Sequence, residues 1–516
     1  MLTNTPEVKG SDKPLRKRTT MRQRQFHSIL TWMPRMFSCT ASFYPALLLP
    51  IMICLTMTAC QTIDATGQRQ LSFIGEQQEV QMGQSSNEEI VKTMGLYEDE
   101  GLQNYVGEIG SRMARTTERP ELPWTFQVID DDVVNAFALP GGYVYLTRGI
   151  LAHFENEAQM AGVLGHEIAH VTAKHSVVRL SKAMITQLGL GVATIAVPEL
   201  QEFSSMLGQG MQLLFLKFSR DDETEADRLG IRYMINVNED PRELIDVMEM
   251  LGSMTGEGGK LPQWASTHPH PENRVEFISA HLAGLDRRNF NPVKRESYLQ
   301  RLDGMVYGAD PREGIIKGSR FYHPEMAFQL RFPEGWGVVN QPSVVLGISP
   351  GKDAAVQLSL GKGEEPLQAL SLFLQQNGIR ALSSARAQVN GLPAAGGEFL
   401  AQTDKGQVHG RAVFILYNER LYRIIGYSSQ QVWSKYDREI SSSANSFSRL
   451  TDDRYLKAEP LRLKIIRTQS SISLKELHAR HNVAIPLEEL ARLNQIGVGE
   501  ILESGRYLKI VAGELP

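Results

Sequence analysis

The chain has 516 residues, which is too many for one hydrophobic core, and at roughly 150 residues per domain we expect three domains. Its composition is that of a globular protein, with 42% hydrophobic and 22% charged residues and no periodic use of its 44 glycines and 24 prolines. Collagen-like, largely disordered and polytopic membrane proteins are therefore excluded. The formal net charge of -4 provides no general positive field, so nucleic acid is not expected as a partner.

The first 60 residues have the pattern of an export signal. Basic residues are concentrated between residues 9 and 35, and an uncharged stretch with an apolar centre follows from Phe37 to Ala59. The ending Met57-Thr-Ala-Cys60 resembles a bacterial lipobox, whose cysteine becomes the lipidated first residue after cleavage. We therefore expect residues 1–60 to be a signal sequence that ends at the lipidation site Cys60, with an uncleaved membrane anchor as the alternative.

The strongest chemical signal is the pentapeptide His166-Glu-Ile-Ala-His170, which follows an apolar run with helical periodicity. In a helix, residues i and i+4 lie on one face, so the two imidazoles can bind one zinc ion while Glu167 lies beside it as a general base. All three cysteines lie within residues 1–60, so the remaining ligands must be nitrogen or oxygen donors. The pattern predicts a catalytic zinc site.

A catalytic zinc site needs a third protein ligand. The extended metzincin pattern is excluded, because it requires glycine and histidine where the sequence has Ala173 and Ser176. In the polar segment of residues 219–230, Glu223 and Asp227 are i, i+4 neighbours. Glu223 can serve as a ligand and Asp227 can orient an imidazole or move a proton, whereas a solvated acidic helix is the alternative interpretation.

Three further segments accompany the metal motif: residues 134–142 (VNAFALPGG), the S-R-x-x-E-x-x-A-D block of residues 219–227, and Ser266-Thr-His-Pro269. Together with the HEXXH motif they resemble the gluzincin metalloproteases of peptidase family M48, over roughly residues 73–280. The resemblance implies one zinc ion per chain, Glu223 as its third ligand, Asp227 as a catalytic partner, and Glu225 outside the ligand set. With no membrane spans beside the motif, the chain is most similar to BepA-like members of the periplasm or outer membrane.

The reaction implied is peptide hydrolysis, in which Glu167 takes a proton from the attacking water and delivers it to the leaving amine. Residues 135–138 and 143–147 have strand-like patterns and are separated by a Pro-Gly-Gly turn. One of them could be an edge strand that binds an extended substrate through its backbone, so the predicted substrate-binding residues are Asn135, Ala136 and Phe137. Alternatively, both strands belong to the core.

His268 has three interpretations. Close to the metal, it could stabilise the developing oxyanion with Arg274 nearby, or it could bind zinc in place of water and keep the enzyme latent. Otherwise it is an ordinary turn histidine before a proline. Four other histidines are given no role: His153, His270, His281, and His175, which is out of phase with the metal motif.

Between the two metal segments, residues 183–218 are apolar and rich in glycine, but Pro198 and Glu199 interrupt any stretch long enough to cross a bilayer. The segment is predicted to be a helical hairpin packed on the core, with an exposed apolar lip near the cleft as the alternative.

The C-terminal half carries two further predicted domains. Residues 301–318 are rich in glycine and are predicted to be a linker. Residues 319–452 mix strand and helix patterns, which predicts an α+β accessory domain that faintly resembles the PsbP/Mog-like fold. Residues 459–513 have the order strand, helix, helix, strand, and their leucine spacing resembles a LysM module, which implies contact with peptidoglycan.

The predicted architecture is multidomain, with a mainly α zincin-type metalloprotease domain that contains a small sheet (residues 61–300), then the α+β domain, then a small βααβ LysM-like module. The predicted function is a zinc endopeptidase of the bacterial cell envelope, on its periplasmic face, anchored to the outer membrane by lipid and acting on unfolded or misassembled envelope proteins. The competing hypothesis is a non-enzymatic chaperone or assembly factor whose metal is structural or capped.

Overall fold

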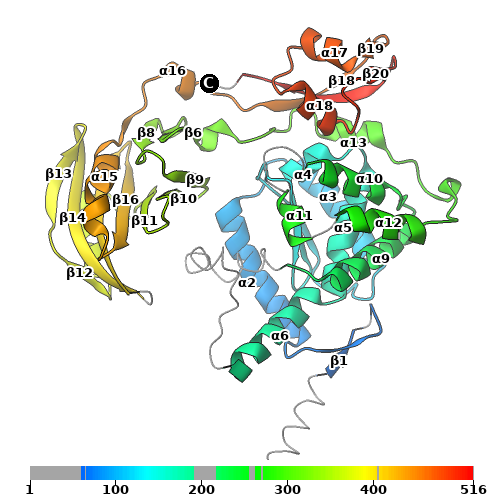
Figure 1. Ribbon diagram of the computed structural model, residues 1–516, viewed down its shortest axis with the longest axis horizontal. Coiled ribbons are helices and arrows are strands. Elements are labelled where there is room, and N and C mark those ends of the chain that lie inside the picture. Colours follow the sequence, from blue (N-terminus) through cyan, green and yellow to red (C-terminus); the bar gives the residue numbers. More distant parts are fainter. Residues whose placement is uncertain are drawn as a thin grey trace, which may run out of the picture. The chain divides into compact units, whose positions relative to one another are not determined.

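The computed structural model describes residues 60–63, 65–190, 217–254, 262–268, 271–403 and 406–514. The predicted signal sequence before Cys60 and most of the apolar segment at residues 183–218 lie outside these ranges. Within them the chain is multidomain, with a helical N-terminal region and a large β-rich C-terminal region (Figure 1). No helix in the described ranges combines the length and the apolar character that crossing a bilayer requires.

The N-terminal region is built from helices around a three-stranded sheet, with a separate two-stranded sheet of β1 and β2 at its start. Its strands are β1 (Cys60–Thr62), β2 (Arg69–Leu71), β3 (Thr125–Ile129), β4 (Ala136–Leu139) and β5 (Tyr143–Thr147). Its helices are α2 (Glu76–Met94), α3 (Glu100–Ala114), α4 (Arg148–His153), α5 (Glu157–Thr172), α6 (His175–Leu190), α9 (Arg220–Asn236), α10 (Glu243–Ser253), α11 (Gln263–Thr267), α12 (Pro271–His281) and α13 (Arg295–Arg301).

The three-stranded sheet has the order β3-β5-β4, so β5 is central and β4 is an edge strand. Strand β3 runs parallel to β5 and β4 runs antiparallel to it. The turn between β4 and β5 requires glycine, because Gly141 has a φ of +83° and a Cβ atom there would lie 2.8 Å from Val80 Cα. The strand pair expected on either side of the Pro-Gly-Gly turn is confirmed.

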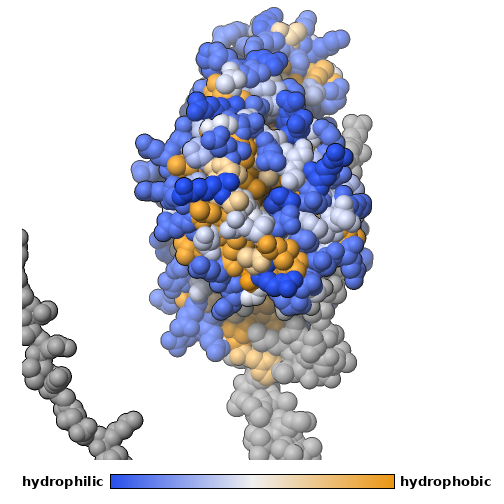
Figure 2. All heavy atoms as spheres, turned by 90° about the vertical axis from the view of Figure 1, so that its left-hand side faces the viewer, coloured by the Kyte–Doolittle hydropathy of each residue, from blue (hydrophilic) through white to orange (hydrophobic). Residues whose placement is uncertain are grey.

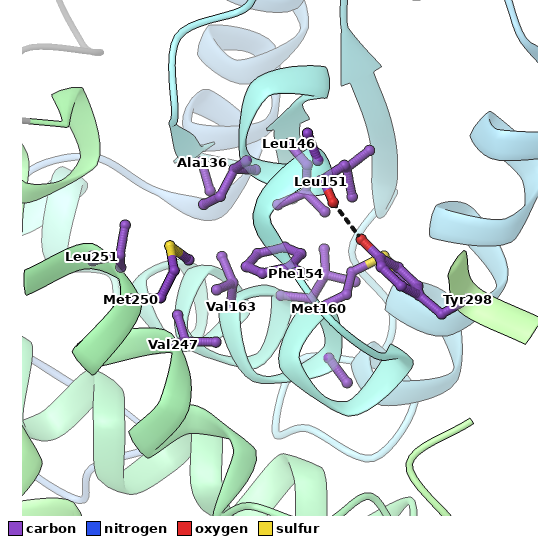
Figure 3. Close-up of a cluster of buried hydrophobic side chains, with 14 of the residues drawn as sticks. Ala136, Leu146, Leu151, Phe154, Met160, Val163, Val247, Met250, Leu251 and Tyr298 are labelled. Carbon is purple, nitrogen blue, oxygen red and sulfur yellow. Dashed lines mark hydrogen bonds between the residues drawn. The ribbon is translucent and has the colours of Figure 1, made fainter. Parts of the chain in front are cut away.

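Helix α5 lies in the middle of the helical region and packs against α3, α9 and α10 (Figure 1). It begins at Asn156, whose side chain accepts a hydrogen bond from Gln159 N (2.9 Å), and all of its residues are buried. Figure 3 shows the apolar cluster around its first half, where Tyr298 Oη donates to Leu151 O (2.8 Å). A helix that is buried on every side holds its side chains in fixed positions.

Helix α9 crosses α5 at close range because both helices have glycine at the contact. A Cβ atom on Gly230 would lie 3.0 Å from His166 N, and one on Gly165 would lie 3.1 Å from Gly230 O. Helix α9 begins with a capping box, in which Ser219 and Asp222 bind each other's backbone N–H groups. The approach of the two backbones brings the acidic residues of α9 against the histidines of α5.

The β-rich region contains an antiparallel sheet of eight strands and a second of four. Its strands are β6 (Ile315–Lys317), β7 (Arg320–His323), β8 (Phe328–Arg331), β9 (Gly337–Gln341), β10 (Val344–Ile348), β11 (Ala354–Leu360), β12 (Ile379–Ala381), β13 (Ala385–Val389), β14 (Leu392–Thr403), β15 (Gly406–Tyr417), β16 (Arg420–Ser429) and β17 (Ser448–Arg449). Helices α14 (Pro366–Leu374) and α15 (Trp433–Asn445) pack on opposite faces of the larger sheet, and the short α16 is Asp453–Leu456.

The last residues form a small module with the predicted order of elements. It consists of β18 (Arg462–Arg467), β19 (Ile472–Ser473), α17 (Leu474–Arg480), α18 (Leu487–Leu493), β20 (Ile501–Leu502) and β21 (Tyr507–Ala512). Strand β18 pairs with β21 and β19 with β20, both antiparallel. The predicted strand, helix, helix, strand order is confirmed, with the short strands β19 and β20 added inside it, whereas the LysM resemblance stays a prediction.

This C-terminal module contacts the N-terminal region through β21. Lys509 is fully buried, and its Nζ donates to the backbone carbonyls of Ala152 (2.9 Å) and Phe154 (2.8 Å). The same ammonium lies 2.9 Å from Glu155 Oε1. Apolar side chains of the module belong to the same core cluster as those of α5. The module is therefore packed on the segment that leads into the metal-motif helix.

Residues 304–307, which the sequence predicts as linker, pair with the first strand of the module. Gly304 N donates to Leu463 O, Leu463 N to Met305 O, and Tyr307 N to Leu461 O, each at 2.8 Å. We call this pairing of residues 304–307 with residues 461–463 the neck. It joins the chain before the β-rich region to the chain after it.

One face of the molecule is shown in Figure 2, where hydrophobic patches interrupt a largely hydrophilic surface. Among the described residues, the most exposed large apolar side chains are Ile501 (68%) and Leu372 (60%), which belong to different elements. Single exposed apolar residues are normal on soluble proteins, so these two identify no binding partner.

Candidate metal centre

Four side chains meet between α5, α9 and the end of α11. His166 and His170 come from α5, Glu223 from α9, and His268 directly follows α11; each offers one donor atom, and these atoms all lie within 4.8 Å of one another. All four residues are buried. Within the described ranges, this is the only group of three or more such side chains close enough to hold a metal ion. The histidines and the glutamate predicted from distant segments are thus brought together.

The distances are those of a compact His-His-Glu site. His166 Nε2 and His170 Nε2 are 3.0 Å apart. Glu223 Oε2 lies 3.5 Å from His166 Nε2, and Glu223 Oε1 lies 3.7 Å from His170 Nε2. The i, i+4 spacing on α5 turns the two rings toward one point, and the close crossing of α9 supplies the carboxylate.

The hydrogen bonds around this group fit a divalent cation. The Nδ1 atom of His166 is 3.0 Å from Asp227 Oδ1, and that of His170 is 2.9 Å from the imidazole of His175. With the Nδ1 atoms engaged in this way, each Nε2 is the nitrogen that a cation would bind once it is deprotonated. Glu223 Oε2 lies 3.0 Å from Arg274 Nη1 and 3.5 Å from His166 Nε2. Two imidazole nitrogens and a buried carboxylate form a donor set that suits zinc.

The charges and burial around the site favour an ionised Glu223 and a neutral His170, the protonation states in which these residues bind a cation. Burial raises the pKa of Glu223, but nearby charges on His268 and Arg274 and hydrogen bonds from His166 and His268 outweigh it and hold this pKa well below 4.5. Burial and the neighbouring His166 charge hold the pKa of His170 well below 6.5. The carboxylate is therefore ionised and the His170 imidazole neutral at neutral pH.

His166 behaves differently in the absence of a cation. Burial and the Arg274 charge lower its pKa, but hydrogen bonds to Asp227 and Glu223 dominate and raise the pKa to about 9. Because a metal ligand must be deprotonated, binding of a cation is expected to release this proton.

Glu167 lies beside the donor set on the same helix and is 1% exposed. Its Oε1 accepts a hydrogen bond from Trp264 Nε1 (3.2 Å) and lies 3.6 Å from His268 Nε2. A carboxylate in this position can take a proton from a water molecule held at the donor set. In the structure, the indole N–H of Trp264 on α11 already donates to one of these two carboxylate oxygens.

Arg274 of α12 binds the two carboxylates of α9. Its Nε and Nη2 donate to Asp227 at 2.8 and 2.5 Å, and its Nη1 lies 3.0 Å from Glu223 Oε2. Burial raises the pKa of Asp227, but the Arg274 charge and the hydrogen bonds from His166 and Arg274 outweigh it and lower this pKa. The guanidinium was predicted near an oxyanion, and the structure places it behind the donor set, where it fixes Asp227 against His166.

His268 is part of the cluster. Its Nδ1 lies 3.0 Å from Glu223 Oε1 and 3.2 Å from His166 Nε2. Its ring stacks on Trp264, with centroids 4.6 Å apart and an interplanar angle of 18°. His268 therefore lies beside the metal donors, as both metal-centred interpretations require, and the interpretation as an isolated turn residue is wrong.

The predicted substrate-binding residues lie on or next to the edge strand β4. Asn135 is buried, and its Oδ1 has no hydrogen-bond partner among the described residues. Ala136 and Phe137 pair with Leu146 and Tyr145 of β5. The ring of Phe137 stacks on Tyr145 inside the core at 4.6 Å, so only the backbone of this residue could contact an extended peptide.

Two residues at the site were not predicted. His175 was set aside as out of phase with the metal motif, but Lys174 has a left-handed backbone (φ 56°) that ends α5 and turns His175 back toward His170. Residues 172–174 contain no glycine or proline, so the sequence offered no signal for this break. Trp264 had no signal in the sequence, since its contact with Glu167 depends on how α11 folds over the site.

Two histidines one helical turn apart, with a glutamate from a later helix and a small mixed sheet, define the zincin class of metal sites. Residues 100–282 match Peptidase family M48. The metalloendopeptidase OMA1 of Schizosaccharomyces pombe, named as mitochondrial, is 31% identical over 249 residues, which are 46% of this chain and 70% of that protein. The chain belongs to peptidase family M48, whose members are metalloproteases.

Other relatives share the same region. The beta-barrel assembly-enhancing protease of Yersinia pestis is 30% identical over 45% of this chain and 50% of its own length, and that of Escherichia coli is 31% identical over 38% and 42%. The chain thus spans about half the length of these two relatives. Among solved structures, cyanobacterial PsbP of Synechocystis aligns with 26% of the chain and 95% of its own at 14% identity, with a TM-score of 0.22 that carries no weight.

Proposed function

We propose that the protein is a zinc-dependent endopeptidase with one zinc ion per chain. The observation that carries this proposal is the position of Glu167 beside the donor atoms of His166, His170 and Glu223. When bound there, zinc supplies a Lewis acid that polarises the scissile carbonyl and lowers the pKa of water. Soft ligands are not needed, because imidazole and carboxylate are both common zinc donors.

The side chains around the zinc site transfer the proton, orient the ligands and bind the peptide. Glu167 takes a proton from the attacking water and returns it to the leaving amine. Asp227 accepts the Nδ1–H of His166 and thereby keeps the ring oriented, while Arg274 holds Asp227 in place. The outer edge of β4, which in the described ranges pairs only with β5, binds an extended peptide through backbone hydrogen bonds, which gives affinity with little sequence preference. The backbone of the preceding Asn135 is already bound to Thr147.

His268 acts in this proposal as a removable cap rather than as an oxyanion partner. It lies within hydrogen-bonding distance of Glu223 and His166, and Trp264 of the same segment occupies Glu167. Substrate must therefore displace α11 together with His268. We expect His268→Ala to raise hydrolysis of an unfolded protein, whereas a role at the oxyanion predicts a loss of about 10²-fold or more.

The substrates proposed are unfolded or misassembled proteins of a bacterial envelope. Several relatives carry the name beta-barrel assembly-enhancing protease, and Cys60 ends a lipobox-like segment. Lipid attached at Cys60 would hold the protein at the periplasmic face of the outer membrane, and the C-terminal module would contact peptidoglycan if its LysM resemblance extends to binding. Radiolabelled palmitate incorporation, lost in Cys60→Ser, tests the anchor.

Glu167→Gln separates the proposed enzyme from a non-enzymatic chaperone. The substitution preserves side-chain shape but removes the proton acceptor, so casein hydrolysis should fall by at least about 10²-fold while zinc content stays at one per chain. The exposed Glu98→Gln is the matched control and should cleave at the wild-type rate.

Three measurements on each variant distinguish the peptidase from the chaperone: casein hydrolysis, zinc content, and suppression of aggregation of an unfolded protein. Wild-type protein that binds zinc yet cleaves nothing, and suppresses aggregation equally well with Glu167→Gln, would establish the chaperone hypothesis and refute the proposed hydrolase.

A further inference from the structure

His175 lies behind the metal centre without belonging to its donor set. It is the first residue of α6 and is 1% exposed. Its Nδ1 lies 2.9 Å from His170 Nδ1, and its Nε2 lies 3.3 Å from Glu225 Oε2. The three side chains form a continuous hydrogen-bonded chain from the His170 imidazole to a carboxylate of α9.

The carboxylate fixes the direction of these hydrogen bonds. An ionised carboxylate can only accept, so the proton of a neutral His175 ring lies on Nε2 and its Nδ1 carries a lone pair. His170 Nδ1 must then be the donor between the two rings. That tautomer leaves the lone pair of His170 on Nε2, the atom that lies 3.0 Å from His166 Nε2 in the donor set.

Glu225 reaches His170 only through His175. Glu223 and Asp227 are one helical turn apart and face α5, whereas Glu225 lies between them in sequence and points to another side of α9. Its carboxylate is itself held, because Gln68 Nε2 donates to Oε1 (3.3 Å) and Arg228 Nη2 lies 3.7 Å away.

The two zinc-site histidines are thus supported in parallel ways. His166 is bound directly by Asp227, and His170 is bound by Glu225 through one intervening imidazole. Other groups that face His175 are the more distant carboxylate of Asp222 (4.0 Å) and the ring of Phe218, with centroids 6.2 Å apart. The nearest acceptor for the Nε2 proton is Glu225.

We infer that His175 and Glu225 are positioning residues of the metal centre, which fix the tautomer and the ring orientation of His170. This inference rests on the proposed zinc site and extends it to a second layer of side chains. Hydrogen-bond partners of metal-bound histidines typically contribute 10- to 100-fold to metal affinity, about the effect expected here.

The test is the zinc dissociation constant of the full chain, measured by competition with a chromogenic chelator, beside the unfolding temperature of the metal-free protein. His175→Leu should weaken zinc binding by about 10- to 100-fold. His175→Gln keeps an amide oxygen that can accept from His170 and should restore most of the affinity. The control is Asp221→Asn, an exposed carboxylate of the same helix, which should change nothing.

Glu225→Gln provides the second variant, since its side chain is 12% exposed and its replacement leaves the core unchanged. It should weaken zinc binding by several-fold, and the double variant with His175→Leu should bind zinc no more weakly than His175→Leu alone, because both residues act through one chain. If His175→Leu does not fold, the result for Glu225→Gln decides.

Two results would overturn the inference in distinguishable ways. Wild-type zinc affinity in both His175→Leu and Glu225→Gln, with a wild type that binds one zinc, removes the positioning role and leaves the proposed peptidase intact. Failure of the wild type to bind zinc at all removes the proposed function and this inference together.

Discussion

Lys509 makes a fully buried polar contact between the C-terminal module and the α4–α5 segment. Its ammonium is completely buried, donates to two carbonyls, and faces Glu155, so burial lowers its pKa against the opposing effect of that carboxylate. Methionine at this position would keep most of the side-chain volume and remove the charge. The carbonyls of Ala152 and Phe154 would then lose a buried donor, while Glu155 would keep Arg295.

The size of the effect follows from these partners. Each carbonyl left unsatisfied costs about 1–3 kcal/mol, and breaking a buried ion pair costs about 3–5 kcal/mol in total. Because Arg295 still compensates Glu155, we expect Lys509→Met to lower the free energy of unfolding by about 3–4 kcal/mol. For a unit of this size that corresponds to roughly 10 °C in the unfolding temperature.

Urea denaturation followed by tryptophan fluorescence measures this change, with Lys464→Met as the control. Lys464 lies on the exposed side of β18, and its replacement should stay within about 0.5 kcal/mol of wild type. The double variant Lys509→Met/Glu155→Gln should recover part of the loss, since it removes the carboxylate that the ammonium faced. A Lys509→Met protein as stable as the Lys464→Met control would show that the module is not held through this contact.

Three further predictions follow from particular contacts. Asp227→Asn should weaken zinc binding by about 10- to 100-fold, measured by chelator competition, because His166 loses its carboxylate acceptor. Gly230→Ala should destabilise the protein by about 1–3 kcal/mol in urea denaturation, since a methyl group would meet the α5 backbone, whereas Gly252→Ala on α10 meets nothing within 4 Å and should be neutral or slightly stabilising. Burial lowers the pKa of His153 from 6.5 to about 4. Between these pH values the imidazole is protonated in the unfolded chain but neutral in the folded protein, so the free energy of unfolding falls as the pH falls. His153→Gln should remove up to about 3 kcal/mol of this acid-induced loss, measured by unfolding from pH 7 to pH 4.

The sequence predicted the metal site well where helical periodicity governs the geometry. The spacing of His166 and His170 is enough to place both rings on one face, and the family resemblance supplied Glu223. His175 was missed because the phase argument assumes an unbroken helix, and the left-handed Lys174 breaks it. Local spacing therefore finds residues on one element and fails where the chain turns back on itself.

Tertiary contacts were harder to predict. Lys509 stands between Leu508 and Ile510 in β21, so the alternating pattern places it on the polar and solvent-facing side of the strand. The structure buries that side against the α4–α5 segment. Sequence patterns do not reveal that another domain covers a strand. The strand order β3-β5-β4 and the contact of Trp264 with Glu167 also depend on how distant segments pack, so they too needed the structure.

The neck has a consequence for how the β-rich region is attached. Because residues 304–307 and 461–463 are hydrogen-bonded neighbours, the chain leaves for the β-rich region and returns from it at almost the same point. Residues 308–460 are then an insertion within a single hairpin, and the segments on either side of them fold as one body. A short turn could replace the whole insertion without separating the metal centre from β21, so the region between could have been gained, lost or exchanged as one piece.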